Sequence, residues 1–121
     1  SRFVADFIGE ANLIPCTIER VSGTLAEITI EGYGHRLPAN GLSPGPATLA
    51  VRPSRLDVKA SAGFKAKVLK STYVGNRMEY TLAVQSGEIF AVHEDVENTL
   101  VLGQEILLGL FATGPVLLPA A

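Results

Sequence analysis

Apolar and polar residues alternate along most of the chain from Cys16 onward, and turn residues interrupt this alternation at short intervals. In TLAEITI (24–30), Ala26, Ile28 and Ile30 point to one face, and EYTLAV (79–84) repeats the pattern. An alternation of period two is typical of strands that are buried on one side. The turn candidates are Ser22-Gly23, Glu31-Gly32, Gly34, Asn40-Gly41, Pro44-Gly45-Pro46, Gly75-Asn76, Ser86-Gly87 and Gly114-Pro115. So many turns in a short chain predict an all-β fold, arranged as a meander or a barrel.

The beginning of the chain is the only helical candidate. Phe3, Val4, Phe7 and Ile8 share one face of a short helix that ends at Gly9. A helix of this length does not stand alone in water, so its apolar face must pack on the barrel, on a missing domain or on a second copy of the chain. We therefore expect Phe3, Phe7 and Ile8 at a dimer or domain interface.

A faint internal repeat divides the strand region into two halves. PCTIERVSGTLAEITI (15–30) followed by GPATLAVR (45–52) parallels KAKVLKSTYVGNRMEYTLAV (65–84) followed by GQEILLGL (103–110). Each half consists of a hairpin, a third short strand and a strand led by glycine. The repeat predicts two small β units, which either form partial barrels in tandem or exchange strands into one intertwined body.

Composition excludes several classes of protein. The 121 residues fit one domain, and the formal net charge of −2 without any basic run lacks the electrostatic pattern of a nucleic-acid binder. Cys16 is the single cysteine, so no disulfide can form within the chain. The apolar runs are too short to span a bilayer, and no signal peptide is recognisable. We expect a cytosolic domain without membrane insertion and, because the only methionine is Met78, a piece of a longer protein.

Motifs for catalysis or cofactor binding are missing from the sequence. There is no G-x-x-x-x-G-K-[ST] loop for nucleotide phosphates and no G-x-S-x-G elbow for a serine nucleophile. His35 and His93 lie 58 residues apart, and they form no closely spaced ligand cluster with Cys16. The carboxylates of Glu88, Glu94, Asp95 and Glu97 are interpreted as a solvated rim. The sequence therefore predicts no enzyme activity, metal or cofactor within this chain.

Two binding functions stay open as alternatives. GLSPGPAT (41–48) can form a nest of backbone N–H groups for a small oxyanion, although its two prolines remove donors. Tyr73, Arg77 and Tyr80 come nearest to the aromatic and basic surface of an OB-fold nucleic-acid binder. Tyr80, however, continues an apolar face, and Tyr73 precedes a turn, which favours roles in the core or at a corner.

Several motifs together resemble one family. RFVADFIGEANLI (2–14), LAVRPSRLDV (49–58) and VLKSTYVGNRMEYTLAV (68–84) follow one another and end in GQEILLGL. This order resembles the C-terminal regulatory region of ATP-binding subunits of ABC importers, which is built on the transport-associated OB (TOBE) fold. Val51, Arg52 and Pro53 match the family's Val-Arg-Pro-Glu signature, but Ser54 replaces the acid. Tyr73, Gly75 and Tyr80 match its second hairpin.

The resemblance implies an organisation and a function. Residues 1–9 would be the helical remnant of a junction with a missing nucleotide-binding domain, and residues 10–118 the regulatory domain, with OB-like small barrels. Its work would be to join two ATPase subunits as a homodimer on permease subunits, at the cytoplasmic side of the inner membrane, with ATP and Mg²⁺ bound only by the missing domain. The junction resembles polyamine (spermidine/putrescine) importers most, then ferric-iron, sulfate and sugar relatives. An oxyanion module such as a molybdate binder of the same fold is the alternative, and a purely structural dimer contact is another.

The end of the strand at Arg52-Pro53 suggests a specific contact. Pro53 cannot donate to a β ladder, so the strand must end, lie at an edge or bulge there. Arg52 would then stand at the strand end, where its guanidinium can clamp a carboxylate or carbonyl groups at the joint between the two halves. The alternative is an exposed arginine at a strand end.

Overall fold

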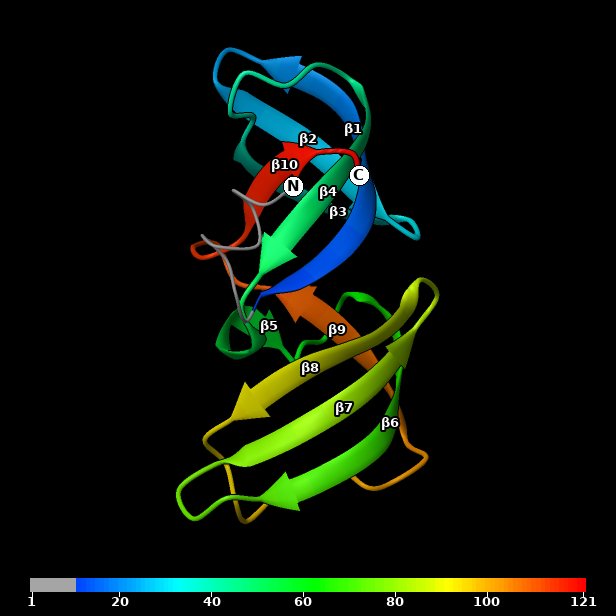
Figure 1. The fold of residues 1–121 in the computed structure, drawn as a ribbon, viewed down its shortest axis with the longest axis vertical. Helices are drawn as coiled ribbons and strands as arrows, with labels where there is room; N and C mark the ends of the chain where they lie inside the picture. Colours follow the sequence, from blue (N-terminus) through cyan, green and yellow to red (C-terminus); the bar gives the residue numbers. More distant parts are fainter. Residues whose placement is uncertain (1–10) are drawn as a thin grey trace.

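The computed structural model describes residues 11–121, which form two five-stranded antiparallel sheets (Figure 1). The strands are β1 (Asn12–Ser22), β2 (Leu25–Ile30), β3 (Tyr33–Pro38), β4 (Gly45–Val51), β5 (Leu56–Asp57), β6 (Phe64–Tyr73), β7 (Met78–Val84), β8 (Gly87–His93), β9 (Glu105–Leu110) and β10 (Val116–Pro119). A 3₁₀ turn, η1 (Pro53–Arg55), precedes β5. The described residues contain no α-helix, as an all-β fold requires, and none long and apolar enough to cross a membrane. The helix expected over residues 1–9 lies outside the described residues.

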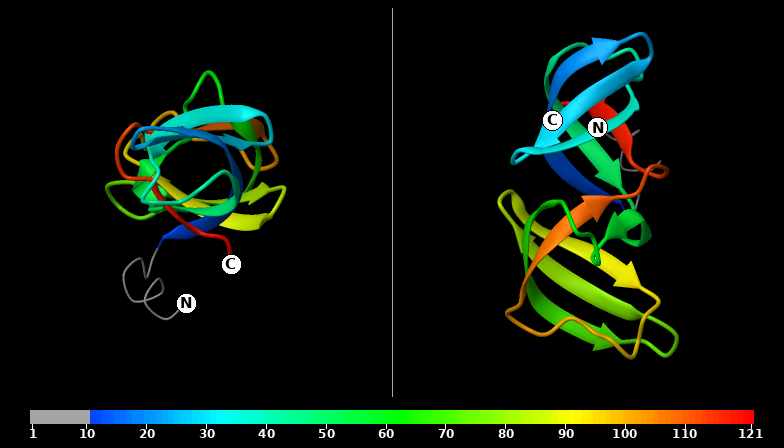
Figure 2. Two further views of the ribbon diagram at one scale, coloured as in Figure 1. Left: turned by 90° about the horizontal axis from the view of Figure 1, so that it is seen from above. Right: turned by 180° about the vertical axis from the view of Figure 1, so that it is seen from behind.

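The two sheets exchange one strand each. The first sheet has the order β10-β4-β1-β2-β3, and the second has the order β5-β9-β6-β7-β8. β5 follows β4 in the chain but pairs with β9, while β10 follows β9 but pairs with β4. We call β1–β4 with β10 the first unit and β6–β9 with β5 the second unit. The repeat seen in the sequence is thus built as an intertwined pair of OB-like small barrels, stacked end to end (Figure 2).

The two units also share a local irregularity. The β1–β2 pairing shifts register between Ile18 and Arg20, and the β6–β7 pairing does so between Val68 and Lys70. A bulge bends its strand and increases the twist, which helps a short sheet to curl into a barrel. The same bend therefore occurs at the same place in both units.

The core follows the alternation of the strands. In β7 the side chains of Met78, Tyr80 and Leu82 are buried, while the residues between them are partly exposed. The ring of Tyr80 is 2% exposed, and its hydroxyl accepts a hydrogen bond from the backbone N–H of Leu100 at 3.0 Å. Tyr80 is therefore a core residue whose polar end is satisfied, whereas Tyr73, at the end of β6, is 62% exposed.

Gly63 lies against the backbone of β9 in the second unit. A Cβ atom at this position would overlap the backbone carbonyl of Leu108. Only a residue without a side chain fits where β6 begins beside β9. The glycine therefore lets the beginning of β6 pass close to β9, with which it pairs.

Candidate interaction surface at the joint of the two units

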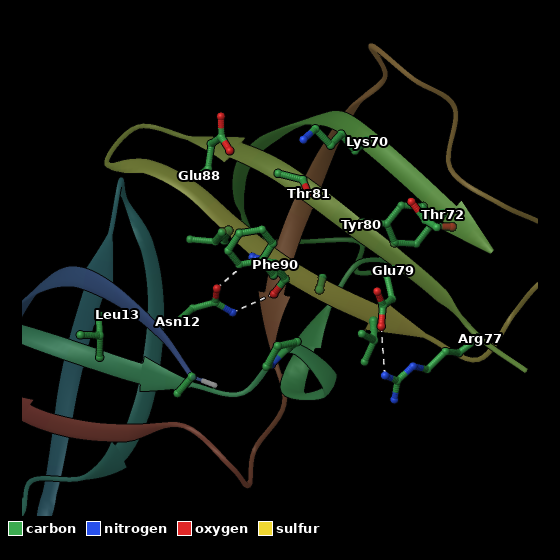
Figure 3. A pocket seen from close by; sticks show the side chains of 15 residues that line it. Asn12, Leu13, Lys70, Thr72, Arg77, Glu79, Tyr80, Thr81, Glu88 and Phe90 are labelled. Carbon is green, nitrogen blue, oxygen red and sulfur yellow. Dashed lines mark hydrogen bonds and ion pairs between the residues drawn. The ribbon is translucent and has the colours of Figure 1, made fainter. Parts of the chain in front are cut away.

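Asn12 connects the two units at the start of β1. Its side-chain amide donates to the carbonyl of Phe90 in β8 at 2.7 Å and to the carbonyl of Val51 at 3.3 Å, and its oxygen accepts from the N–H of Phe90 at 2.8 Å (Figure 3). This pair of bonds to Phe90 is the one that a neighbouring strand would make. Asn12 is 7% exposed, and among residues 11–121 it is the one polar residue that is buried. Sequence reasoning gave no signal for it, because its partner lies 78 residues away.

Arg55 forms a second connection between the units. Its Nε donates to the carbonyl of Thr113 at 2.9 Å, its Nη2 donates to the Thr113 hydroxyl at 3.0 Å, and its guanidinium lies 4.8 Å from the ring centre of Phe111. Arg55 precedes β5, and Thr113 precedes β10, so this contact joins the two segments that cross between the units. In addition, the N–H of Leu110 in β9 donates to the Tyr33 hydroxyl of β3 at 3.3 Å.

The strand end at Arg52-Pro53 lies beside these connections. β4 ends at Val51, and Pro53 begins η1, so the strand stops where the proline predicts. The backbone carbonyl of Arg52 accepts from the N–H of Arg55 at 2.9 Å. The Arg52 side chain is exposed and has no hydrogen bond or ion pair with any residue of 11–121. The sequence predicts a contact for Arg52 and none for Arg55, although the two arginines stand on either side of Pro53. Arg55 reaches Thr113 only because β5 is exchanged into the other sheet, and no local pattern predicts that exchange.

A shallow groove of about 680 Å³ runs along the outer face of β6, β7 and β8, next to Asn12 and Leu13 of β1 (Figure 3). Pairing aligns this face in three rows across the strands: Lys67, Ala83 and Glu88; Lys70, Thr81 and Phe90; Thr72, Glu79 and Val92. The middle strand carries the small side chains of Ala83 and Thr81, flanked by larger ones. Charge is separated across the face, with lysines on β6 and Glu88 on β8. Glu79 is paired with Arg77 at 3.0 Å.

The other predicted site residues are dispersed. Tyr73 and Gly75 stand at the β6–β7 turn, where Gly75 has a φ of 92° and the N–H of Val74 donates to the carbonyl of Arg77. Phe3, Phe7 and Ile8 lie outside the described residues. Half of the proposed oxyanion nest at 41–48 belongs to β4, which begins at Gly45 and pairs with β1.

The shifted pKa values among the described residues have simple structural causes. Burial raises the pKa of the Cys16 thiol to about 11, which keeps it protonated and unreactive. Burial also lowers the pKa of His35, whose Nε2 has no hydrogen-bond partner. Asp95 has a lowered pKa because its carboxylate accepts hydrogen bonds from the N–H groups of Asn98 and Glu97 in the β8–β9 loop. In residues 11–121, His, Cys, Asp and Glu form no group that could hold a metal ion.

Among known proteins, the chain is similar to ATP-binding subunits of importers. It is 39% identical over 99% of its length to the Fe(3+) ions import ATP-binding protein FbpC of Rhizobium etli, of which it covers 35%. The FbpC protein of Brucella abortus is 40% identical over 88% of the chain, which covers 31% of that protein. The spermidine/putrescine import ATP-binding protein PotA of Pseudomonas aeruginosa is 34% identical over 73% of the chain, which covers 27% of that protein. The chain therefore spans about a third of the length of these curated relatives.

The fold is also found in a solved structure. The molybdate-bound form of ModG, a cytoplasmic molybdate-binding protein, matches with a TM-score of 0.63 at 20% identity, over 91% of this chain and 96% of that one. The likeness shows a shared fold. A family model described as the TOBE domain matches residues 49–118, which is more than half of the chain. The two intertwined β units, their order and this match together establish that the chain belongs to the TOBE domain family.

Proposed function

We propose that this chain is the regulatory and self-association domain at the C-terminal end of an ATP-binding subunit of an ABC importer. The observation that carries the proposal is the similarity, over 99% of the chain, to a third of such a subunit. In the parent protein, ATP and Mg²⁺ would be bound by the missing ATPase domain, and that domain would dock on permease subunits at the cytoplasmic face of the membrane. The present domain would perform none of the hydrolysis.

The cargo that we propose for the parent transporter is ferric iron. The junction residues favoured polyamine importers, but the identity is higher and covers more of the chain for the iron relatives, at 39% over 99%, than for the polyamine relative, at 34% over 73%. Polyamine import is the alternative. A regulatory domain does not touch the cargo in the translocation path, so this assignment rests on relatedness alone.

The contacts at the joint between the units suit a domain that would change how two ATP-binding subunits are aligned. Asn12, Arg55 and Tyr33 each bond across it, and two strands are exchanged, so the units are expected to move as one body. A ligand or inhibitor protein that binds this body can change the ATPase only if it binds the two alignments of the subunits with different affinity.

A chimeric transporter tests the proposal. The corresponding C-terminal part of the Rhizobium etli FbpC protein is replaced by this chain, and ATP hydrolysis and uptake of labelled Fe³⁺ are measured with its own permease. We expect both activities to persist, and a matched chimera built on the Pseudomonas aeruginosa PotA protein to be poorer in spermidine uptake. A chimera that folds and hydrolyses ATP but takes up no iron would contradict the proposal.

The oxyanion alternative predicts a different result. Molybdate, tungstate or sulfate would raise the melting temperature of the isolated chain in a saturable way, because a ligand that binds only the folded state stabilises it by mass action. Nucleic-acid binding, the other alternative, predicts a salt-dependent affinity for single strands. Absence of both effects leaves the importer assignment in place.

A further inference from the structure

We propose that two copies of this chain associate through the outer face of β6, β7 and β8, about a two-fold axis that runs along β7. The proposal rests on the self-association assigned above and names the surface that performs it. With this axis, β6 of one copy lies over β8 of the other, and each row of the face meets the same row of the partner copy.

The shape of the face permits this approach. The axis passes over Ala83 and Thr81, which are small and half-buried, while longer side chains on β6 and β8 rise on either side. In the dimer, the longer side chains of β6 meet those of β8 of the partner copy, while the small side chains of β7 face each other along the axis and leave room for this contact. Glu79 also lies on the axis, but Arg77 neutralises it within its own copy.

The charges of the face are complementary to themselves. Lys67 and Glu88 occupy opposite ends of one row, with Ala83 between them, and neither forms an ion pair within residues 11–121. Rotation about β7 brings Lys67 of one copy to Glu88 of the other, twice in each dimer. In the next row, Lys70 meets the ring of Phe90, which is a favourable cation–π arrangement. A face with a basic side and an acidic, aromatic side is suited to a second copy of itself rather than to a partner of one charge.

Phe90 provides a fixed apolar anchor at the edge of this face. Its side chain is 55% exposed, and Leu13 of the first unit, 49% exposed, lines the same groove. The two hydrogen bonds between the side chain of Asn12 and the backbone of Phe90 hold this backbone in place (Figure 3). An exposed aromatic side chain on a fixed backbone, with polar residues around it, has the character of an interface hot spot, since little conformational entropy is lost on binding.

Charge reversal tests the pairing. Lys67→Glu and Glu88→Lys are made separately in the full 121-residue chain, and the mass is measured by sedimentation over a concentration series. Each variant alone should dimerise at least about tenfold more weakly than the wild type, because two like-charge pairs face each other. An equimolar mixture of the two variants should form heterodimers of wild-type affinity, as should the double variant in one chain. Arg36→Glu and Glu31→Lys, which make the same charge changes on the first unit, serve as controls and should leave the mass unchanged.

The outcomes separate this inference from the proposed function. If the wild type dimerises and neither single variant changes the affinity, or if mixing restores nothing, the face is wrong while self-association stands. A Phe3→Ser/Phe7→Ser variant that then abolishes the dimer would assign the contact to the N-terminal residues. A wild-type chain that stays monomeric throughout the series overturns both the face and the self-association.

Discussion

At the scale of single residues, Asn12 is the side chain that most directly couples the two units. Replacing it with Ala leaves the N–H and carbonyl of Phe90 without their partner, so we expect Asn12→Ala to lower the free energy of unfolding by about 1–3 kcal/mol. Chemical denaturation measures this. Asn12→Asp keeps the acceptor but sets a carboxylate against two carbonyl oxygens, and its loss should therefore be larger at pH 7 than at pH 4. An unchanged unfolding free energy in Asn12→Ala would contradict the coupling.

His35 makes the stability depend on pH. Burial lowers its pKa in the folded state, so the unfolded chain takes up a proton more readily. The contribution of neutral His35 is fully present above the ordinary pKa of about 6.5 and is lost as the pH falls through the lower pKa of the folded state. The charged side chains that line the hollow around His35 are those of Glu19, Arg20, Glu27 and Arg36. We expect the melting temperature of the wild type to fall more steeply below pH 6.5 than that of His35→Gln, and parallel curves would refute this.

At the scale of elements, the exchanged strand β10 is expected to hold the first unit together. Leu117 is buried against β4 at 1% exposure, and its carbonyl accepts a hydrogen bond from the side chain of Asn40. Leu117→Ala should cost about 2–5 kcal/mol, as for other deletions of a buried leucine. Hydrogen exchange should then rise in β4 and β1. Removal of the exposed Ala120 and Ala121 is the control and should change neither, whereas equal effects of the two changes would argue against the role of β10.

The elements also separate what the sequence predicts from what it does not. The strands around Ile28 and Leu82 follow from alternation, and the two-unit repeat follows from the similar order of hairpins, because both signals are local. The exchange of β5 and β10 has no such signal, since β5 has two residues and β10 pairs with a strand far back in the chain. For the same reason, local patterns do not predict the bonds of Asn12 to Phe90 and of Arg55 to Thr113. Arg52 is predicted instead, because it matches the Val-Arg-Pro motif and precedes the proline that ends the strand.

Arg52 and Arg55 can be compared directly at this joint. Arg55→Ala removes two hydrogen bonds to Thr113 and the contact with Phe111, and should lower the free energy of unfolding by about 1 kcal/mol. Arg52→Ala tests the clamp predicted from the Val-Arg-Pro motif. A change in melting temperature or self-association in Arg52→Ala would support that clamp, and no change in either would reject it. Arg55→Ala without any effect would show that the exchanged strands alone hold the joint.

At the scale of the whole molecule, two β units are joined into one body by the exchange of β5 and β10. We propose that this body associates with a second copy of itself. The most direct test is the mass of the purified chain in solution, measured by sedimentation or light scattering over a wide range of concentration. We expect a dimer that dissociates on dilution, whereas a monomer at the highest concentrations would rule out the proposed self-association.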